Sequence, residues 1–197
     1  MKAFLTSCNR PKELLKTLKS LEPIKDQIES IRIHEDCDMK TIDQIKREVD
    51  LNIHVVRMNR GQIKSISHYF ENAHGKYYLH LEDDWFFNPR TVQHFIKDSI
   101  EIMEQDPNII KVLSRAEFKM NTEVKNGIEY ICETELYGKV WHGFSWNPGV
   151  SRLDLLKARN LDQHEHDINL DVHGLGYRVA YLPYNVYTHI GHNSPRS

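Results

Sequence analysis

Residues 75–85 of this 197-residue chain read Gly-Lys-Tyr-Tyr-Leu-His-Leu-Glu-Asp-Asp-Trp. The apolar and aromatic residues over Lys76–Leu81 predict a β-strand. Glu82, Asp83 and Asp84 follow this strand directly. Open α/β sheets bind their ligands at the carboxyl ends of the strands, so the stretch predicts three acidic side chains at a ligand-binding edge.

The residues around this stretch alternate short β-rich runs with amphipathic helical runs, which is typical of βαβ units. Before it, we expect strands over Lys2–Thr6, Ile28–His34 and Asn52–Val56, and helices from Pro11, over Lys40–Val49 and over Gln62–Asn72. After it, we expect a helix from beyond Pro89 to Gln105, a strand over Ile109–Leu113, a hairpin at Asn126-Gly127, helices over Arg152–Ala158 and Gln163–His173, and a strand over Arg178–Leu182. The pattern predicts one α/β domain over residues 1–197, with a mainly parallel central sheet flanked by helices.

The composition limits the classes of function. With 26 basic and 28 acidic residues, the net charge is -2, and the chain lacks the strongly basic surface that nucleic-acid binding needs. No segment approaches the roughly 20 apolar residues that span a bilayer, and the amino terminus resembles a strand rather than a signal peptide. Three scattered cysteines, Cys8, Cys37 and Cys132, predict free thiols. We therefore expect a soluble, cytoplasmic protein.

The three adjacent acids at positions 82–84 repel one another unless solvent, a cation or basic groups offset their charge. Mg²⁺ or Mn²⁺ is a suitable partner, because these ions take few protein carboxylates and complete their shells with phosphate oxygens and water. The alternative is an exposed acidic turn after a strand.

Several motifs in the first ninety residues favour the cation. The segments 6–11 (Thr-Ser-Cys-Asn-Arg-Pro), 34–38, 59–64 (Asn-Arg-Gly-Gln-Ile-Lys) and 75–84 occur in the order and spacing that resemble family-2 glycosyltransferases and their GT-A relatives. In that family, a strand leads into a metal motif of the D-x-D type. The resemblance implies a GT-A fold, in which residues 1–88 form a nucleotide-binding half and residues 89–197 an acceptor and donor-sugar half.

The same resemblance implies roles for individual residues. Asp84 would ligate the metal ion, with Asp83 or Glu82 beside the donor ribose and sugar. Glu82 replaces the commoner aspartate, so which of the three acids touches the metal stays open. Lys64 would lie near the ribose or phosphates, and the nucleoside pocket would be lined by Thr6, Asn9, Arg10 and Asp36.

A general base is expected in the second half of the chain. Family-2 enzymes carry an acidic residue eleven positions before a Gly-Tyr pair, and counting back from Gly176-Tyr177 leads to Glu165. His164 stands where an acid is usual, which leaves Asp167 as a rival. Both carboxylates also lie near a predicted helix start, where they would stabilise the helix dipole without any catalytic role.

Two further groups remain candidates. His189 and His192 resemble the histidine that several GT-A enzymes supply to the metal, although a plain surface role fits them as well. Trp141, Phe144 and Trp146 lie in a loop with many aromatic residues, where they would stack on sugar faces or pack in the core. We assign Trp146 to the donor site.

These expectations describe a metal-dependent, inverting glycosyltransferase that moves a hexose, with a UDP-sugar favoured, to a hydroxyl of a glycan or glycoprotein. The compact form resembles modules of bacterial or virus-encoded multidomain glycosyltransferases. A nucleotidyltransferase is one alternative, but residues 7–11 lack the glycine that a triphosphate-binding loop needs. A non-catalytic module that binds nucleotides or sugars is the other.

Overall fold

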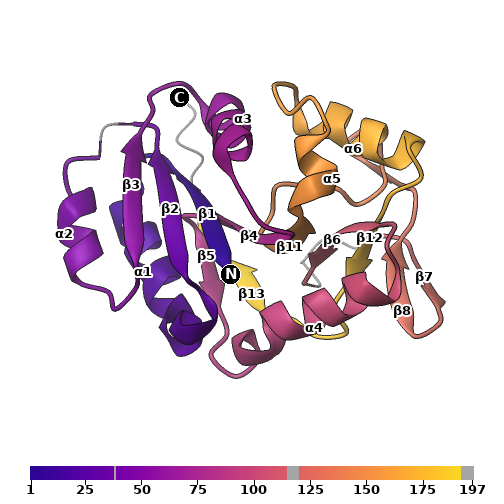
Figure 1. Ribbon diagram of the computed structural model, residues 1–197, viewed down its shortest axis with the longest axis horizontal. Helices are drawn as coiled ribbons and strands as arrows, with labels where there is room; N and C mark the ends of the chain where they lie inside the picture. Colours follow the sequence, from indigo (N-terminus) through magenta and orange to yellow (C-terminus); the bar gives the residue numbers. More distant parts are fainter. Residues whose placement is uncertain (38, 115–119, 192–197) are drawn as a thin grey trace.

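A nine-stranded sheet forms the centre of the computed structural model, which describes residues 1–37, 39–114 and 120–191 (Figure 1). The strands stand in the order β3-β2-β1-β4-β11-β6-β12-β8-β7. Their bounds are β1 Lys2–Ser7, β2 Ser30–Glu35, β3 Ile53–Arg57, β4 Tyr77–Glu82, β6 Ile109–Leu113, β7 Thr122–Lys125, β8 Ile128–Ile131, β11 Gly149–Arg152 and β12 Arg178–Tyr181.

The first four strands of the sheet are parallel, as the alternation of strands and helices predicts. β11 runs antiparallel to both β4 and β6, and β8 runs antiparallel to β12. Because β1, β2 and β4 are parallel neighbours, the loops that follow them leave the sheet at the same edge. That edge carries the acidic stretch.

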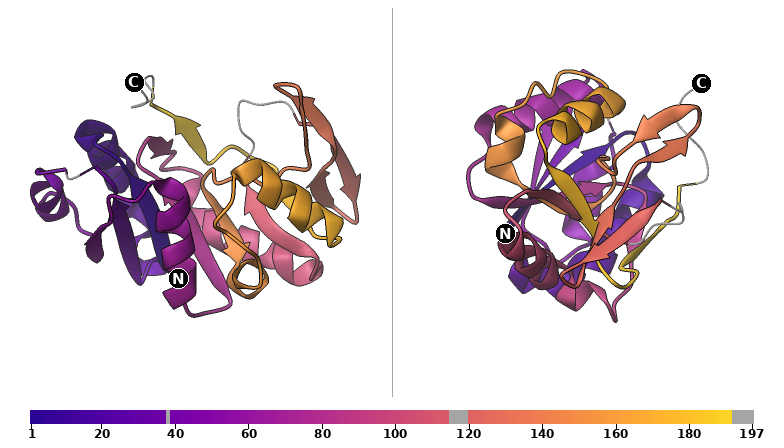
Figure 2. Two further views of the ribbon diagram at one scale, coloured as in Figure 1. Left: turned by 90° about the horizontal axis from the view of Figure 1, so that it is seen from above. Right: turned by 90° about the vertical axis from the view of Figure 1, so that its right-hand side faces the viewer.

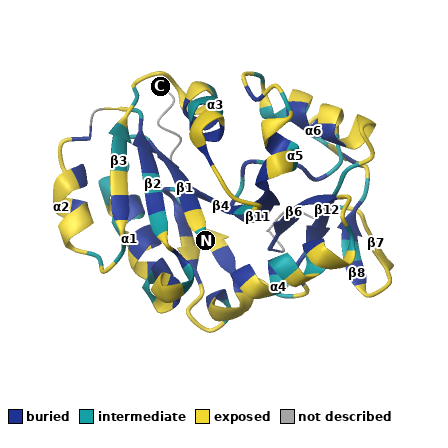
Figure 3. Ribbon diagram, in the orientation of Figure 1, coloured by how far each residue is buried: buried dark blue, intermediate teal, exposed yellow. Residues whose placement is uncertain are grey.

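Helices cover both faces of the sheet (Figures 1 and 2). One face is covered by α1 Pro11–Leu21, the 3₁₀ segment η1 Glu22–Gln27, α2 Ile42–Arg47 and α4 Val92–Gln105; the other by α3 Gln62–Asn72, α5 Leu153–Lys157 and α6 Glu165–Gly174. The central strands β4, β6 and β11 are mostly buried, whereas β7 at one edge of the sheet and the outer helix faces are exposed (Figure 3). Burial of apolar side chains on both faces gives two cores, one on each side of the sheet.

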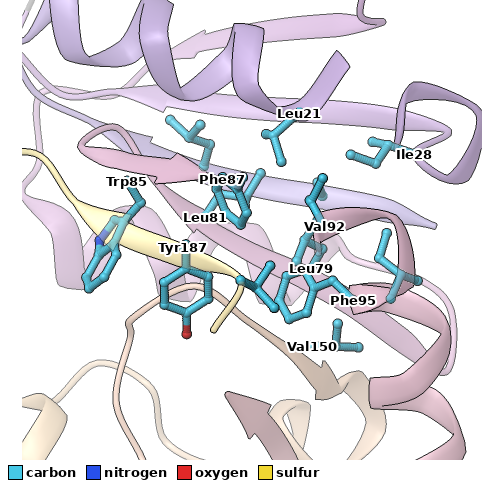
Figure 4. Packing of buried hydrophobic residues seen from close by; sticks show 14 of the residues in the cluster. Leu21, Ile28, Leu79, Leu81, Trp85, Phe87, Val92, Phe95, Val150 and Tyr187 are labelled. Atoms are coloured by element: carbon cyan, nitrogen blue, oxygen red, sulfur yellow. The ribbon is translucent and has the colours of Figure 1, made fainter. Parts of the chain in front are cut away.

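A small two-stranded sheet packs on the α1 and α4 face. β5 Trp85–Phe87 pairs antiparallel with β13 Tyr187–His189, so that Trp85 stands opposite His189. Phe87, Phe95 and Tyr187 fill the space beneath it (Figure 4). This pairing brings the end of the described chain beside the residues that follow β4.

Two hydroxyl groups of α1 fix the backbone of β5. Thr17 Oγ1 donates to the Asp83 carbonyl at 2.9 Å and accepts the Trp85 N–H at 3.2 Å, and Ser20 Oγ accepts the Phe87 N–H at 3.0 Å. Both hydroxyls are buried, so they satisfy backbone groups that would otherwise lose hydrogen bonds to water. The turn after β4 is therefore held rigidly against α1.

The expected single α/β domain with a mostly parallel sheet is confirmed, and the predicted helices all occur with small changes of bounds. The hairpin at Asn126-Gly127 is confirmed as β7–β8, with positive φ at both turn residues. The sequence did not predict β5, β11, β13 or the hairpin of β9 Thr134–Leu136 with β10 Lys139–Trp141. These strands have three or four residues each, too few to show a periodic pattern.

The prediction of free thiols is wrong for two of the three cysteines. Cys8 and Cys37 form a disulfide that joins the loop after β1 to the loop after β2, while Cys132, also among the described residues, is a free thiol. The two half-cystines are 29 residues apart in sequence but follow adjacent parallel strands, which brings their Cα atoms to 4.9 Å. In the part of the chain that the structure describes, no helix has the length and apolar character to cross a membrane.

Candidate active site

The loops after β1, β2 and β4 meet at one edge of the sheet. Thr6 on β1 is in register with Glu82 on β4, and Ser7 is in register with Glu35 on β2. The residues that continue each strand therefore lie side by side. Asp83 and Asp84, which the sequence places directly after β4, are both nearly fully buried at this edge.

Asp83 is held by the loop after β1. Its Oδ2 atom accepts hydrogen bonds from the Ser7 hydroxyl and the Cys8 N–H, each at 3.0 Å, and Arg10 Nη1 lies 3.3 Å from Oδ1. Burial raises the pKa of Asp83 to about 6, and the Cys8 N–H and Arg10 oppose this rise by favouring the carboxylate. Asp83 thus joins β4 to the loop after β1.

Asp84 faces two basic side chains. Arg10 donates to its Oδ2 atom, and His189 Nε2 lies 3.1 Å from the same oxygen. The Ile190 N–H donates to the Asp84 carbonyl at 2.8 Å, which extends the β5–β13 pairing by one contact. A Cβ atom on Gly191 would overlap Asp84 Oδ2, so only glycine fits this position without displacing the carboxylate.

Glu82 is the last residue of β4 and precedes Asp83, which lies in the turn after the strand. Its two oxygens accept hydrogen bonds from the Gln62 amide and from Trp85 Nε1, both at 3.0 Å. Burial raises the pKa of Glu82 to about 8, and the nearby charges of Asp84 and Glu165 raise it further. The cluster therefore resists full ionisation unless a cation binds nearby.

Glu165 is the first residue of α6, and its Oε1 atom accepts the backbone N–H of Trp146. Burial raises the pKa of Glu165, while the Trp146 N–H and the ammonium group of Lys111 lower it. Glu165 lines a pocket of about 200 Å³ that is mostly apolar. The other lining residues are Leu113, Ser114, Met120, Leu136, Tyr137, Trp141, Gly143, Ser145, Asn147, Tyr181 and Tyr187.

The site thus combines the buried acids Asp83 and Asp84, at the carboxyl end of β4, with a pocket that contains the carboxylate of Glu165. The model of the family described as glycosyl transferase family 2 matches residues 3–162, which is most of the chain. The chain belongs to glycosyl transferase family 2. This membership does not support the nucleotidyltransferase alternative. No curated protein matches its sequence.

Solved structures of glycosyltransferases share the fold of this family-2 domain at low sequence identity. S. aureus TarS 1-349 is 17% identical with a TM-score of 0.65, over 95% of this chain and 59% of that one. A mannosyltransferase from Pyrobaculum calidifontis, in complex with GDP-Man and Mn²⁺, is 13% identical with a TM-score of 0.69, over 100% of this chain and 57% of that one.

Glucosyl-3-phosphoglycerate synthase from Mycobacterium tuberculosis, in complex with Mn²⁺, UDP-Glc and glycerol 3-phosphate, is 14% identical with a TM-score of 0.65, over 98% of this chain and 72% of that one. These likenesses confirm the GT-A fold. The chain spans less than three fifths of the length of TarS 1-349 and of the mannosyltransferase.

The residues predicted for the nucleoside pocket occupy the same edge of this family-2 domain. Thr6 is 8% exposed near the end of β1, and Asn9 is exposed with a φ of 50°. Asp36 accepts the Arg60 N–H at 2.6 Å, which ties the loop after β2 to the loop after β3. Lys64 is exposed on α3. Arg10 contacts the acids Asp83 and Asp84 at this edge.

The aromatic loop of this family-2 domain divides between the core and the pocket. Phe144 and Trp146 are 1% and 5% exposed, and the Trp146 ring packs against Phe144, Phe70 and His80. The predicted stacking of Trp146 on a donor sugar is therefore not available to its buried ring. Core packing, the alternative we considered, describes both residues. Trp141 lines the pocket.

The two candidate bases differ in placement: Asp167 is exposed on α6 and does not line the pocket, whereas Glu165 does. His189 lies against Asp84, and His192 lies outside the described residues. Residues 165 and 189 both follow the end of the family match at residue 162. Their placement therefore comes from the fold rather than from the match.

Several residues of the site escaped the sequence analysis. Ser7, Gln62 and Gly191 contact the acids through pairings that only the folded chain creates. Lys111 acts on Glu165 through its charge. Its sequence context could have identified it, because it is a lysine within the apolar run Ile-Ile-Lys-Val-Leu over residues 109–113. Charged residues at the centre of a buried strand are uncommon unless they have a partner.

Whether the site suits a metal ion depends on the donor atoms that converge there. Among residues 1–37, 39–114 and 120–191, no group of three or more His, Cys, Asp or Glu side chains could hold one. Asp84 Oδ2 and His189 Nε2 do converge, and the His189 side chain is 42% exposed. Two protein ligands fit an ion whose remaining positions are filled by phosphate oxygens and water.

Proposed function

We propose that the chain transfers a sugar from a nucleoside-diphosphate donor to a hydroxyl group of its acceptor, with Mn²⁺ or Mg²⁺ held by Asp84 and His189. The observation that carries this proposal is the approach of His189 Nε2 to Asp84 Oδ2, at 3.1 Å, on the edge where nucleotides bind in such sheets. When bound, the ion offsets the negative charge that develops on the leaving nucleoside diphosphate.

Arg10 supports the same assignment from the protein side. Its guanidinium group lies against both Asp83 and Asp84, and buried carboxylates are stable only with positive charge or hydrogen-bond donors nearby. When a donor is bound, Arg10 is well placed to turn toward the diphosphate, because guanidinium groups bind phosphate oxygens through paired hydrogen bonds. We assign Arg10 to the diphosphate rather than to the nucleoside.

The nucleoside would bind across the loops after β1, β2 and β3. We assign Thr6, Asn9 and Asp36 to its pocket and Lys64 to the ribose or phosphates. Exposure of Asn9 and Lys64 and the position of Asp36 beside Arg60 support these roles. Glu82 and Asp83 complete the donor side. Residues 1–88 then act as the nucleotide-binding half, and residues 89–197 carry the sugar and acceptor contacts.

Glu165 is our choice for the general base. An acceptor hydroxyl attacks well only when its proton is removed during the attack, and a carboxylate with a raised pKa accepts a proton more readily than an ordinary one. The apolar pocket beside Glu165 would bind the acceptor and exclude water from the reacting oxygen. One base without a second nucleophile implies a single displacement, so the anomeric configuration would invert.

The donor class is proposed from structures of the same fold, and the acceptor class from the residues of the pocket. A UDP-hexose is our first choice of donor, and GDP sugars are the main competitor, since relatives of the same fold were solved with UDP-Glc and with GDP-Man. The acceptor would be a hydroxyl of a glycan or glycoprotein. Aromatic residues at the pocket, including Trp141 and Tyr137, support a sugar ring as the group bound there.

A panel of nucleotide sugars tests this function. The protein is incubated with UDP-glucose, UDP-N-acetylglucosamine, GDP-mannose and TDP-glucose, each with Mn²⁺ or with EDTA, and the released nucleoside diphosphate is measured. We expect release from one donor class with Mn²⁺ only. Glu165→Gln should reduce release by roughly 10²-fold or more while donor binding persists. Asp167→Asn is the matched control and should retain activity; the opposite result would make Asp167 the base.

A further inference from the structure

Lys111 is a lysine buried in the middle of the sheet. It lies on β6, where all five residues are buried, and its own exposure is 0%. Its ammonium group donates to the carbonyl oxygens of Ser145 and Asn147, the latter at 2.8 Å. Burying a charged group is costly, and an apolar side chain would usually serve a strand centre as well or better. The position therefore calls for a reason beyond packing.

The chain makes room for this lysine. A Cβ atom on Gly149 of the neighbouring strand β11 would lie 2.7 Å from Lys111 Cε, so the lysine side chain runs over the bare backbone of a glycine. The rings of Phe144 and Trp146 flank the ammonium group at 5.6 and 5.8 Å from their centres. Aromatic faces attract cations, so this surrounding favours the protonated form of Lys111.

One peptide group connects Lys111 to Glu165. The carbonyl of Ser145 and the N–H of Trp146 belong to the same peptide, and in a trans peptide these two bonds point in opposite directions. The carbonyl accepts a hydrogen bond from Lys111, and the N–H donates one to Glu165 Oε1. Hydrogen bonds in such a chain polarise one another, so the lysine strengthens the bond that the peptide donates to the carboxylate.

The charges around Lys111 also link it to Glu165. Burial lowers the pKa of Lys111 to about 7. The carboxyl groups of Glu165 on α6 and Glu82 on β4 face Lys111 and raise its pKa, which opposes the effect of burial. Lys111 in turn lowers the pKa of Glu165 and of His80, the buried imidazole of β4. The ammonium group and the Glu165 carboxylate thus stabilise one another across the Ser145–Trp146 peptide.

We propose that Lys111 is a positioning residue for Glu165: by binding the Ser145 and Asn147 carbonyls, it fixes the Trp146 N–H toward the carboxylate and holds that carboxylate ionised and aimed into the pocket. The proposal rests on the role of Glu165 given above as the base. It assigns to Lys111 no contact with donor or acceptor, since the residue is fully buried.

Titration by NMR tests the relation without any transfer reaction. Protein labelled with ¹³C at the glutamate carboxyl carbons is titrated as wild type, Lys111→Met and Lys157→Met, and the signal absent from Glu165→Gln identifies Glu165. We expect the Glu165 midpoint to rise by about one pH unit or more in Lys111→Met. Lys157 donates to the Ala73 carbonyl at 2.8 Å, so Lys157→Met is a matched loss of a lysine–carbonyl contact and should leave the midpoint unchanged.

If Lys111→Met fails to fold, a second measurement tests the same relation from the side of Lys111. Wild type and Glu165→Gln are labelled with ¹³C at the lysine ε-carbon, and the buried Lys111 signal is followed with pH. Because coupling between two sites is reciprocal, the Lys111 midpoint should fall when Glu165 loses its charge. An unchanged Lys111 midpoint in Glu165→Gln, or an unchanged Glu165 midpoint in folded Lys111→Met, would overturn the proposal. Full turnover by Glu165→Gln would instead refute Glu165 as the base while leaving these midpoints interpretable.

Discussion

His189 Nε2 lies 3.1 Å from Asp84 Oδ2, although 105 residues separate the two in the chain. The contact exists because β13 pairs with β5, which places His189 opposite Trp85 and the Ile190 N–H on the Asp84 carbonyl. The backbone at both residues is therefore held by hydrogen bonds between the two segments. This pairing fixes the pair of side chains that we assign to the cation.

Gly191→Ala should disturb this pair directly. The added Cβ atom would overlap Asp84 Oδ2, so either the carboxylate or the chain after β13 must move. We expect Mn²⁺-dependent nucleotide binding to weaken by roughly 10-fold or more, since metal ligands depend on supporting geometry. Gly174→Ala is the control, because a Cβ atom at this last residue of α6 meets nothing within 4 Å. Equal affinities for the two variants, measured by calorimetry, would refute the role of Gly191.

Arg10→Met should destabilise the protein in the absence of metal. Arg10 provides positive charge to both Asp83 and Asp84, which are buried, and its loss leaves their carboxylates without it. We expect a loss of roughly 1–3 kcal/mol in the free energy of unfolding. Added Mn²⁺ should raise the melting temperature of Arg10→Met more than that of wild type.

Arg57→Met is the control for Arg10, since its ion pair with Asp43 is exposed on both sides. This variant should cost less than about 1 kcal/mol. If Mn²⁺ stabilises both variants and wild type equally, the ion does not bind at the acids that Arg10 faces.

The disulfide predicts a dependence on reducing agents. Cleavage of the Cys8–Cys37 bond by a dithiol frees the loop that carries the Cys8 N–H donated to Asp83. We expect the double variant Cys8→Ser/Cys37→Ser to lose roughly 2–4 kcal/mol of stability and to bind nucleotide more weakly. Cys132→Ser should change neither property, as Cys132 is a free thiol. Thiol titration of unfolded, unreduced protein should find one thiol per chain; three would contradict the disulfide.

Stability should fall on acidification because of buried histidines. Burial lowers the pKa of His34 from 6.5 to about 4, and burial also lowers the pKa of His80. Both are neutral in the folded protein, whereas the unfolded chain takes up protons as the pH falls below about 6.5. The stability that they contribute is therefore present above pH 6.5 and is lost as the pH falls toward 4, by at most about 3 kcal/mol for His34.

Urea unfolding of wild type and His34→Gln between pH 4.5 and 7.5 measures this loss. The free energy of unfolding should depend less steeply on pH in His34→Gln. His54, exposed on β3, offers the control His54→Asn, which should follow the wild-type curve. Parallel curves for all three proteins would show that His34 does not titrate as its burial implies.

Much of the fold follows from local pattern. The apolar and aromatic run of β4 and the leucines of α1 at helical spacing define elements that need no tertiary information. The acids after β4 could be placed at the sheet edge because parallel strands align their carboxyl ends. Their family resemblance came from order and spacing within the first ninety residues, which the family match covers almost completely.

The remainder depends on contacts between distant segments. β13 forms only because β5 is available as a partner, and the three residues of each strand carry no period of their own. The disulfide depends on the parallel pairing of β1 with β2. The many aromatic residues of its loop led us to assign Trp146 to the donor site, but its ring packs against His80 and Phe70.

The most direct test of the central claim is calorimetric titration of the purified protein with UDP, GDP and TDP, each with and without Mn²⁺, repeated on Asp84→Ala. We predict that one nucleotide binds only when Mn²⁺ is present, and that Asp84→Ala abolishes this binding while the variant stays folded. Binding of equal affinity without Mn²⁺, or undiminished binding by Asp84→Ala, would contradict a metal-assisted donor site at Asp84.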